Sequence, residues 1–278
     1  MVDSRRALEL SRCTWLLFKK TLFLLEAISG TRPALRTTML KLAFAWMISV
    51  CVASSHEEKP DKRLQDAAEA FGEIMDAPDK AIPEKLLDKA KCVIIVPGMK
   101  KAALGIGGSY GRGFVSCLTP TGHWGPPAGV RLAGGSFGLQ LGVQSTDVVM
   151  LVMNQRGLDR LLSDKFKIGA EAAAAAGPIG RNAAADTDIL MDAEIISWSR
   201  SRGIFAGVSL DGTVVQQDKE ENEKLYGKPL TTKEIVQGNV TAPPGSRVLI
   251  SVLEKYAPHR KTARAKRASR LPASALAR

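Results

Sequence analysis

The sequence predicts a single α+β domain built on a strongly curved, glycine-rich antiparallel β-sheet with helices packed against it. Three observations lead to this prediction. A run of β-branched residues begins at Cys92, segments of helical periodicity flank a strand-rich centre, and the 278-residue chain contains 25 glycines. A chain of this length can bury one substantial core. Because missing side chains let backbones approach closely, the glycines predict tight packing or strong curvature.

The expected elements follow from the spacing of apolar residues. In 62–75 these residues recur every three or four positions, which predicts an amphipathic helix. A short helix is expected at 83–91, with Pro83 in its first turn. The run 92–96, closed by Pro97-Gly98, predicts a buried strand. Further strands are expected at 102–118, 128–143, 147–153, 194–199, 204–210 and 213–216, and further helices after Asn154, on the surface at 218–226, and at 247–256.

The basic charge is concentrated at the two ends of the chain. The formal net charge of +11 divides into +4 for residues 1–38, +7 for residues 259–278, and zero for the part between them. That central part is nevertheless uneven, because no Asp or Glu occurs between Asp88 and Asp147. A sheet built from this stretch would present a positive face to anionic headgroups or phosphates, unless nearby acidic helices neutralise it. Both interpretations stay open at this point.

The N-terminal segment resembles an export signal. Residues 39–55 contain a lysine, an apolar run and small residues, in the order typical of a signal peptide. We expect Met39 to be the start, with residues 1–38 as an upstream extension. Cys51 is a weaker candidate for lipid modification. These features predict export to the periplasm or cell envelope, with peripheral association with the membrane.

The chain is therefore expected to consist of three parts. A leader covers residues 1–55, and the folded domain covers residues 56–256. A basic tail at 257–278 lacks any apolar period and is expected to be disordered. No run of about 20 apolar residues occurs, so the sequence predicts no conventional transmembrane helix.

The cysteines and acidic clusters do not predict a metal site. Cys92 and Cys117 flank apolar strands, where they are either small buried hydrophobes or, in an exported protein, a disulfide. No C-x-x-C motif occurs, which argues against zinc. The acidic residues after position 185 lack EF-hand spacing, so we expect a solvated acidic edge and not a calcium site. These residues are Asp186, Asp188, Asp192 and Glu194.

A five-residue phrase occurs twice, as GGSYG at 107–111 and as GGSFG at 134–138. Alternate residues of a strand face opposite sides, so Gly107, Ser109 and Gly111 share one nearly bare face. We interpret both phrases as scaffold, because a bare face permits close approach, curvature or a bulge. Neither a Walker loop nor the third glycine of a dinucleotide fingerprint is present, which argues against nucleotide binding.

The same phrases also match G-x-S-x-G, the nucleophile elbow of serine hydrolases. The elbow needs a strand that turns sharply into a helix, whereas both phrases continue as strand-like sequence. We therefore expect no enzymatic activity and keep hydrolysis as the least favoured alternative. Its candidate residues would be Ser109 or Ser136 as nucleophile, His123 or His259 as base, and Asp147 or Asp186 as orienting acid.

The chain contains, in order, the runs VIIVPGMKKAALGIGGSYGRGFV, GHWGPPAGVRLAGGSFGLQLGVQSTDVVMLVMN, LDRLLSDKFKIGAEAAAAAGPIGR, SRSRGIFAGVSLDGTVV and NEKLYG. Together they closely resemble the SYLF domain family over residues 63–236. The resemblance implies a lipid-binding module without enzyme activity or cofactor. Eukaryotic members of the family bind phosphoinositides and actin, whereas the exported bacterial type, which this chain resembles, is mostly without assigned biochemistry.

Two sets of candidate residues follow from the resemblance, which attributes lipid contacts to an amphipathic N-terminal helix and to basic residues. The helix is expected at 62–75, where acidic residues weaken binding to anionic membranes and packing onto the sheet is the alternative. Its membrane-contact candidates are Lys62, Arg63, Leu64 and Phe71. The headgroup-binding candidates are Lys100, Lys101, Arg112, Arg131, Arg200 and Arg202, each with solvated surface charge as the alternative.

The predicted function is thus noncatalytic binding of anionic, phosphoinositide-like lipid headgroups at a membrane surface. The expected partner is an anionic phospholipid or membrane surface, with a protein or filament as a further partner and no specific nucleic acid. The main alternative is an actin-binding or other protein-interaction module. No metal or other cofactor is expected.

Overall fold

The computed structural model describes residues 59–77, 82–177, 193–201, 204–207, 210–238 and 240–258, and it describes the backbone alone at 103–106, 136–143 and 204–207. The predicted leader, most of the basic tail, Arg202 and the aspartates at 186–192 lie outside the described residues. Among those described, no helix has both the length and the apolar character needed to cross a bilayer.

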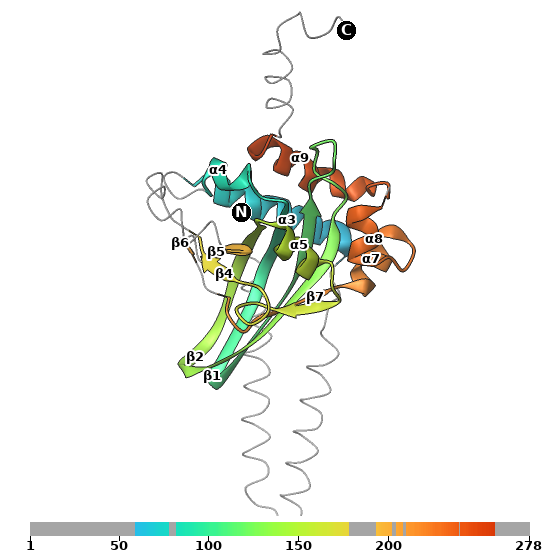
Figure 1. Cartoon of the computed structure of the whole chain (residues 1–278). Coiled ribbons are helices and arrows are strands. Elements are labelled where there is room, and N and C mark those ends of the chain that lie inside the picture. The colour runs from blue at the N-terminus through green and yellow to red at the C-terminus, as the bar shows by residue number, and fades with distance from the viewer. Residues whose placement is uncertain are drawn as a thin grey trace, which may run out of the picture. The chain divides into compact units, whose positions relative to one another are not determined.

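Two described helices precede the strands, one follows the first two strands, and the remaining helices follow the last strand (Figure 1). The helices are α3 (Pro60–Met75), α4 (Glu84–Leu87), α5 (Gln155–Leu161), α7 (Lys219–Tyr226), α8 (Thr232–Gln237), the 3₁₀ turn η2 (Pro244–Ser246) and α9 (Arg247–Tyr256). The strands are β1 (Cys92–Cys117), β2 (Ala128–Val152), β3 (Lys165–Lys167), β4 (Ala174–Ala176), β5 (Ile195–Ser201), β6 (Ile204–Gly207) and β7 (Val214–Gln217).

The strands β1 and β2 form one long antiparallel hairpin, paired from Cys92–Val152 to Val115–Ala128. The prediction that Pro97-Gly98 ends the first strand is wrong. This dipeptide instead forms a bulge inside β1, where Gly98 has a positive φ of 56°. The backbone N–H of Gly98, left without a ladder partner, donates to Asp147 Oδ1 at 2.8 Å. A bulge stabilised in this way bends the strand without ending it.

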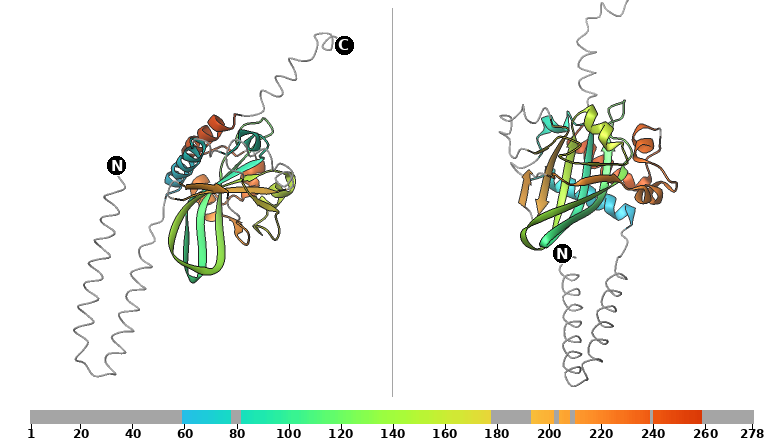
Figure 2. Two further views of the ribbon diagram at one scale, coloured as in Figure 1. Left: turned by 90° about the vertical axis from the view of Figure 1, so that its left-hand side faces the viewer. Right: turned by 60° about the horizontal axis from the view of Figure 1, so that its bottom comes forward.

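Both strands of the hairpin curve out of the body of the domain and return to it, as the left view of Figure 2 shows. The bend falls at a second irregularity of the register, where the pairing passes from Leu104–Leu141 to Ile106–Phe137. Three residues of β2 therefore lie opposite the single residue Gly105 of β1. The extra length on one strand accounts for the sharp bend.

Glycines allow the outgoing and returning halves of β1 to lie against each other. A Cβ on Gly113 would lie 2.0 Å from the carbonyl oxygen of Ile95, and one on Gly111 would lie 2.6 Å from Cγ1 of Val96. Real Cβ atoms do not approach other atoms so closely, so only glycine fits either position. The scaffold interpretation is supported at Gly111 of the first phrase, which faces this crossing, whereas Gly134 of the second phrase faces Ser109 and Thr213.

The strand β2 is the hub of a seven-stranded sheet in the described part of the chain. One edge of β2 pairs with β1, while the other pairs with β7 near its start and with β5 near its end. The remaining strands extend this frame: β3 pairs with β7, and β6 and β4 pair with β5. The β4–β5 pair is parallel, so the sheet is mixed and not purely antiparallel as predicted.

The sheet is covered on both faces. The helices α3 and α9 pack on one face, where Phe71 of α3 meets Tyr256 of α9 edge to face with ring centroids 6.2 Å apart. The other face encloses a second apolar cluster, made by both halves of β1 together with residues of α5, β3 and α8. Because alternate residues of each strand enter different clusters, both faces of the hairpin are apolar in sequence.

Cys92 and Cys117 form a disulfide that joins the two ends of β1. The bend in the strand brings them together although 25 positions separate them in the chain. A backbone hydrogen bond next to the disulfide also joins the two ends of the strand, because Leu118 N–H donates to the carbonyl of Lys91 at 2.8 Å. Of the two interpretations of these cysteines, the disulfide is the one that the structure contains.

Replacement of Gly113 by alanine should lower the free energy of unfolding by about 2–4 kcal/mol, because the new methyl group forces the halves of β1 apart. Urea or thermal unfolding would measure the change. Gly135→Ala is the matched control, since a Cβ there has no heavy atom within 4 Å. Equal effects of the two substitutions would contradict the role given to the crossing.

Removal of the disulfide, as in the double variant Cys92→Ala/Cys117→Ala, should cost about 3 kcal/mol of stability, because the reduced chain gains freedom when unfolded. Thermal unfolding with and without a reducing agent would measure this effect. The reductant should destabilise the parent protein and leave the double variant unchanged. Two titratable thiols at these positions in the native, non-reduced protein would contradict the pairing.

Candidate functional site

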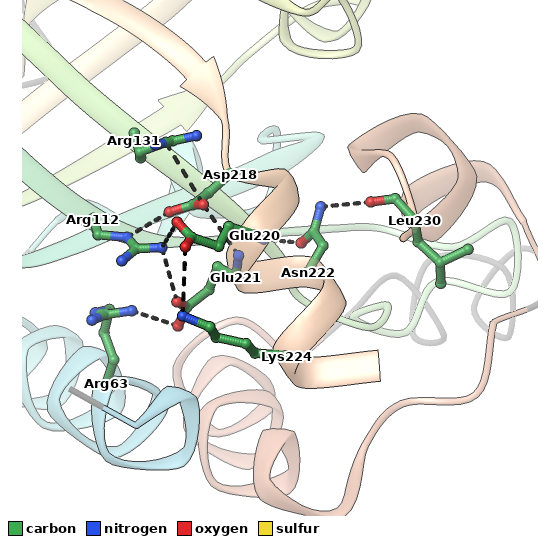
Figure 3. Close-up of polar contacts among 10 residues, drawn as sticks. Arg63, Arg112, Arg131, Asp218, Glu220, Glu221, Asn222, Lys224 and Leu230 are labelled. Carbon is green, nitrogen blue, oxygen red and sulfur yellow. Dashed lines mark hydrogen bonds and ion pairs between the residues drawn. The ribbon is translucent and has the colours of Figure 1, made fainter. Parts of the chain in front are cut away.

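Three arginines from three different elements converge on the acidic helix α7 (Figure 3). They are Arg63 of α3, Arg112 of β1 and Arg131 of β2, of which the last two are direct partners across the hairpin. Like charges placed directly opposite each other destabilise a strand pair. The hairpin therefore requires negative charge at this point, and α7 supplies it.

Asp218 is the centre of this network. Its side chain is fully buried, and its carboxylate accepts from Arg112 Nε at 2.6 Å and lies 3.6 Å from Arg131 Nε. The same carboxylate accepts from the backbone N–H of Glu221 at 3.1 Å and so caps the start of α7. One side chain thus begins the helix and neutralises the hairpin.

Glu221 extends the network to α3. Its carboxylate lies 2.5 Å from Arg63 Nη1 and 3.3 Å from Arg112 Nη2, and its side chain is almost fully buried. Burial raises the pKa of Glu221, against the opposing attraction of Arg63 and Arg112. Burial also acts to lower the pKa of Arg112, but the hydrogen bond and charge of Asp218 outweigh it and the net change is upward. The Arg112 guanidinium therefore stays charged.

Further contacts fix α7 against the start of β2. Asn222 accepts from the backbone N–H of Gly129 at 2.6 Å and donates to the carbonyl of Leu230 at 3.0 Å. The hydroxyl of Tyr226 donates to the carbonyl of Pro127 at 2.6 Å, and burial raises the pKa of this tyrosine. A Cβ on Gly129 would lie 2.8 Å from Cβ of Glu221, so the helix packs directly on the backbone. The prediction of α7 as a surface helix is therefore wrong on this side.

The predicted headgroup-binding residues do not form one patch. Arg112 and Arg131 are neutralised by acidic residues of α7. This agrees with the alternative stated above, in which nearby acidic helices neutralise the stretch without Asp or Glu. Arg200 of β5 forms an ion pair with Glu73 of α3. Lys100 is exposed on the hairpin and donates to Ser145 Oγ at 2.9 Å, whereas Lys101, the next residue of the strand and therefore on its other face, is half-buried. Among the described residues, neither lysine forms an ion pair.

The membrane-contact candidates on α3 divide in a similar way. Leu64 and Phe71 are buried in the apolar cluster between the helix and the sheet. Arg63 is buried in the α7 network, and only Lys62 is exposed, where it pairs with Asp66 at 2.7 Å. In this conformation α3 packs onto the sheet, which is the alternative that its acidic residues suggested.

A groove of about 370 Å³ lies between α3 and the Pro97-Gly98 bulge. Its lining carries more negative than positive charge. No group of three or more His, Cys, Asp or Glu side chains in the described ranges is arranged to hold a metal ion. The groove is lined by Asp66, Glu69, Ala70, Glu73, Pro97, Gly98, Lys100 and Asp147.

The structure contradicts the serine-elbow interpretation. Ser109 and Ser136 both lie inside the paired hairpin, opposite Gly134 and Gly107, and neither phrase is at a strand-to-helix corner. Ser109 Oγ donates to the carbonyl of Gly134 at 3.4 Å. His123 lies in the turn after β1, where its Nδ1 is 3.1 Å from Glu254 Oε1. The two phrases lie opposite each other in the hairpin and pair with each other.

Sequence reasoning missed the residues that organise this region. Asp218, Glu221 and Asn222 belong to a strongly charged stretch, whose composition indicates a solvated helix. The available signal was the absence of acidic residues around Arg112 and Arg131, which requires compensation from elsewhere. It does not identify which of the acidic helices supplies that compensation.

Comparison with known proteins places this arrangement in a family. Residues 133–256 match the Ysc84 family, described as "Las17-binding protein actin regulator". The SH3 domain-containing YSC84-like protein 1 of Bos taurus is 30% identical over 221 residues, which cover 78% of this chain and 64% of that protein. Protein YSC84 of Saccharomyces cerevisiae is 32% identical over 183 residues, 64% of this chain and 39% of that protein.

The chain belongs to the Ysc84, or SYLF, family. A further relative, LAS seventeen-binding protein 3 of Saccharomyces cerevisiae, is 32% identical over 182 residues. The match to the Ysc84 relatives thus spans between about two fifths and two thirds of their length. The names of these relatives describe binding and regulation, which supports a binding module as the general role of the SYLF domain.

The substitution Asp218→Ala should lower the free energy of unfolding by about 3–5 kcal/mol, because it leaves two half-buried arginines without their fully buried partner and removes a helix cap. Chemical denaturation would measure the loss. Glu220→Ala is the control: this glutamate is mostly exposed and lies 3.7 Å from Arg112, so its removal should cost less than about 1 kcal/mol. A similar loss in both variants would show that the buried network is not what stabilises α7.

Proposed function

We propose that this domain is a noncatalytic module that binds anionic lipid headgroups at a membrane surface. The observation that carries the proposal is the adjacent pair Lys100–Lys101, on a hairpin without a single acidic residue between Lys89 and Thr146. The arginines of the same stretch are committed to α7. Lys100 and Lys101 are thus basic residues in the curved part of the hairpin, and no described carboxylate forms an ion pair with either of them.

The electrostatics of the lysine pair suit a lipid surface. Each basic residue close to an anionic membrane contributes about 1 kcal/mol to binding, and the attraction decays within a Debye length. Lys100 is held by a serine hydroxyl, which orients its ammonium group without neutralising it. Binding through such a pair is weak for an isolated domain and sensitive to salt.

Export to the periplasm or cell envelope is part of the proposal. The signal-like segment at 39–55 suggests this location, and the Cys92–Cys117 disulfide supports it, because disulfides persist in oxidising compartments. In that location the domain would meet the headgroups of the envelope membranes.

A protein partner is the second candidate. The relatives described as Las17-binding and actin-regulating support it. The groove between α3 and the bulge also supports it, because the carboxylates of Asp66, Glu69, Glu73 and Asp147 would suit a basic peptide segment. Co-sedimentation with filaments in the absence of lipid would favour this candidate over the first.

The double variant Lys100→Glu/Lys101→Glu should bind vesicles of phosphatidylserine and phosphatidylcholine about tenfold more weakly or worse, given about 1 kcal/mol per charge. Vesicle flotation at several salt concentrations would measure binding. Lys228→Glu/Lys233→Glu is the matched control, since both residues are exposed and lie beyond β7. An equal loss of vesicle binding in both variants would mean that only the net charge of the protein matters, which would contradict a binding site at Lys100 and Lys101.

A further inference from the structure

We propose that the bend of the β1–β2 hairpin enters the lipid bilayer as a shallow apolar wedge. The inference rests on the proposed function, which it deepens by naming the element that meets the hydrocarbon. Here the hairpin bend means residues 103–106 of β1 and 136–143 of β2. Backbone pairing holds these two segments together, with Leu104 opposite Leu141 and Ile106 opposite Phe137.

The composition of the hairpin bend is unusual for a turn of a sheet. The two segments read ALGI and SFGLQLGV, with Ser136 and Gln140 as their polar residues. No charged residue occurs from 102 to 111 or from 132 to 146. Turns that face water are typically rich in Asp, Asn and other polar residues, so the sequence here favours a different environment.

The backbone places this apolar segment at the far end of the curved hairpin. Figures 1 and 2 show β1 and β2 leaving the helices together and reversing direction at the bend. The described residues on either side of the bend include exposed polar and aromatic side chains. Tyr110 is half exposed, Lys100 is exposed, and Gln144 and Ser145 are exposed on the opposite strand.

This order of residues fits a membrane interface. Tyrosines are enriched at the level of the headgroups, while lysines beside an apolar segment extend towards the lipid phosphates. The lysine pair would therefore hold the headgroups while the hairpin bend lies among the upper acyl chains. Unpaired backbone N–H and C=O groups are costly in hydrocarbon. The β1–β2 ladder pairs the backbone on both sides of the bend but leaves Gly105 and residues 138–140 without ladder partners, so the insertion is shallow.

A tryptophan reporter tests the insertion directly. In the full chain, Phe137→Trp should show a blue-shifted emission and strong quenching when phosphatidylserine vesicles contain acyl chains brominated near the headgroup. Val248→Trp is the control, because Val248 is exposed on α9, away from the hairpin. The chain already contains four tryptophans, among them Trp46 in the apolar signal-like run, so quenching is measured as the excess over the parent protein in the same vesicles. Phe137→Trp should show this excess and Val248→Trp should not.

A second variant tests whether the apolar side chains contribute to binding. Leu104→Thr/Leu141→Thr keeps strand propensity and removes apolar surface, so it should weaken vesicle binding by about tenfold or more. The midpoint of unfolding, measured in parallel, should stay close to that of the parent protein. A variant that keeps full vesicle affinity would overturn the insertion.

The outcomes separate this inference from the proposed function. If the protein binds anionic vesicles but the Phe137→Trp reporter stays unquenched, the wedge is wrong and headgroup binding stands. If the parent protein binds no anionic vesicle, both the wedge and the proposed headgroup binding are wrong. A blue shift that needs no lipid and grows with protein concentration would assign the hairpin bend to contact between two copies of the chain, which also overturns the insertion.

Discussion

The close approach of the two halves of β1 is the constraint on which the rest of the domain depends. At Gly113 the strand has no room even for a methyl group against the carbonyl of Ile95. This crossing lets a 26-residue strand return to its origin, so that Cys117 meets Cys92. Because β2 follows β1 throughout, it is bent in the same way and offers separate edges to β7 and β5. The curvature of the sheet is therefore a consequence of missing side chains.

The curved hairpin also carries two kinds of basic residue: arginines that form ion pairs inside the domain, and lysines that do not. Where the hairpin passes α7, its arginines are opposite each other and are compensated by Asp218 and Glu221. Towards the bend no acidic residue accompanies the hairpin, and Lys100 and Lys101 form no ion pair within the described part of the chain. An overall count of basic residues would treat these two groups as equivalent, whereas burial and ion pairing distinguish the arginines that hold α7 from the lysines.

Local features of the sequence predicted the local parts of the structure. The periodicity of α3, the Asn154 cap of α5 and the bare faces of the glycine phrases all depend on neighbours within a few positions, and all are present. The bulge at Pro97-Gly98 depends on a carboxylate 49 positions away, at Asp147. The burial of α7 depends on Arg112, 106 positions before Asp218. Contacts between residues so far apart in the chain leave no local pattern, so neither could be predicted from this sequence, although the order of its motifs identifies the family.

The position of β2 at the centre of the sheet has a consequence for how the chain folds. Its partners begin at Cys92 and extend to Gln217, so the ladder cannot be completed until most of the domain has emerged. Such a high contact order slows folding and leaves strand edges open to aggregation in the meantime. If the chain is exported, as we propose, slow folding would help to keep it unfolded until it is translocated, and its open strand edges would be exposed to aggregation during transit.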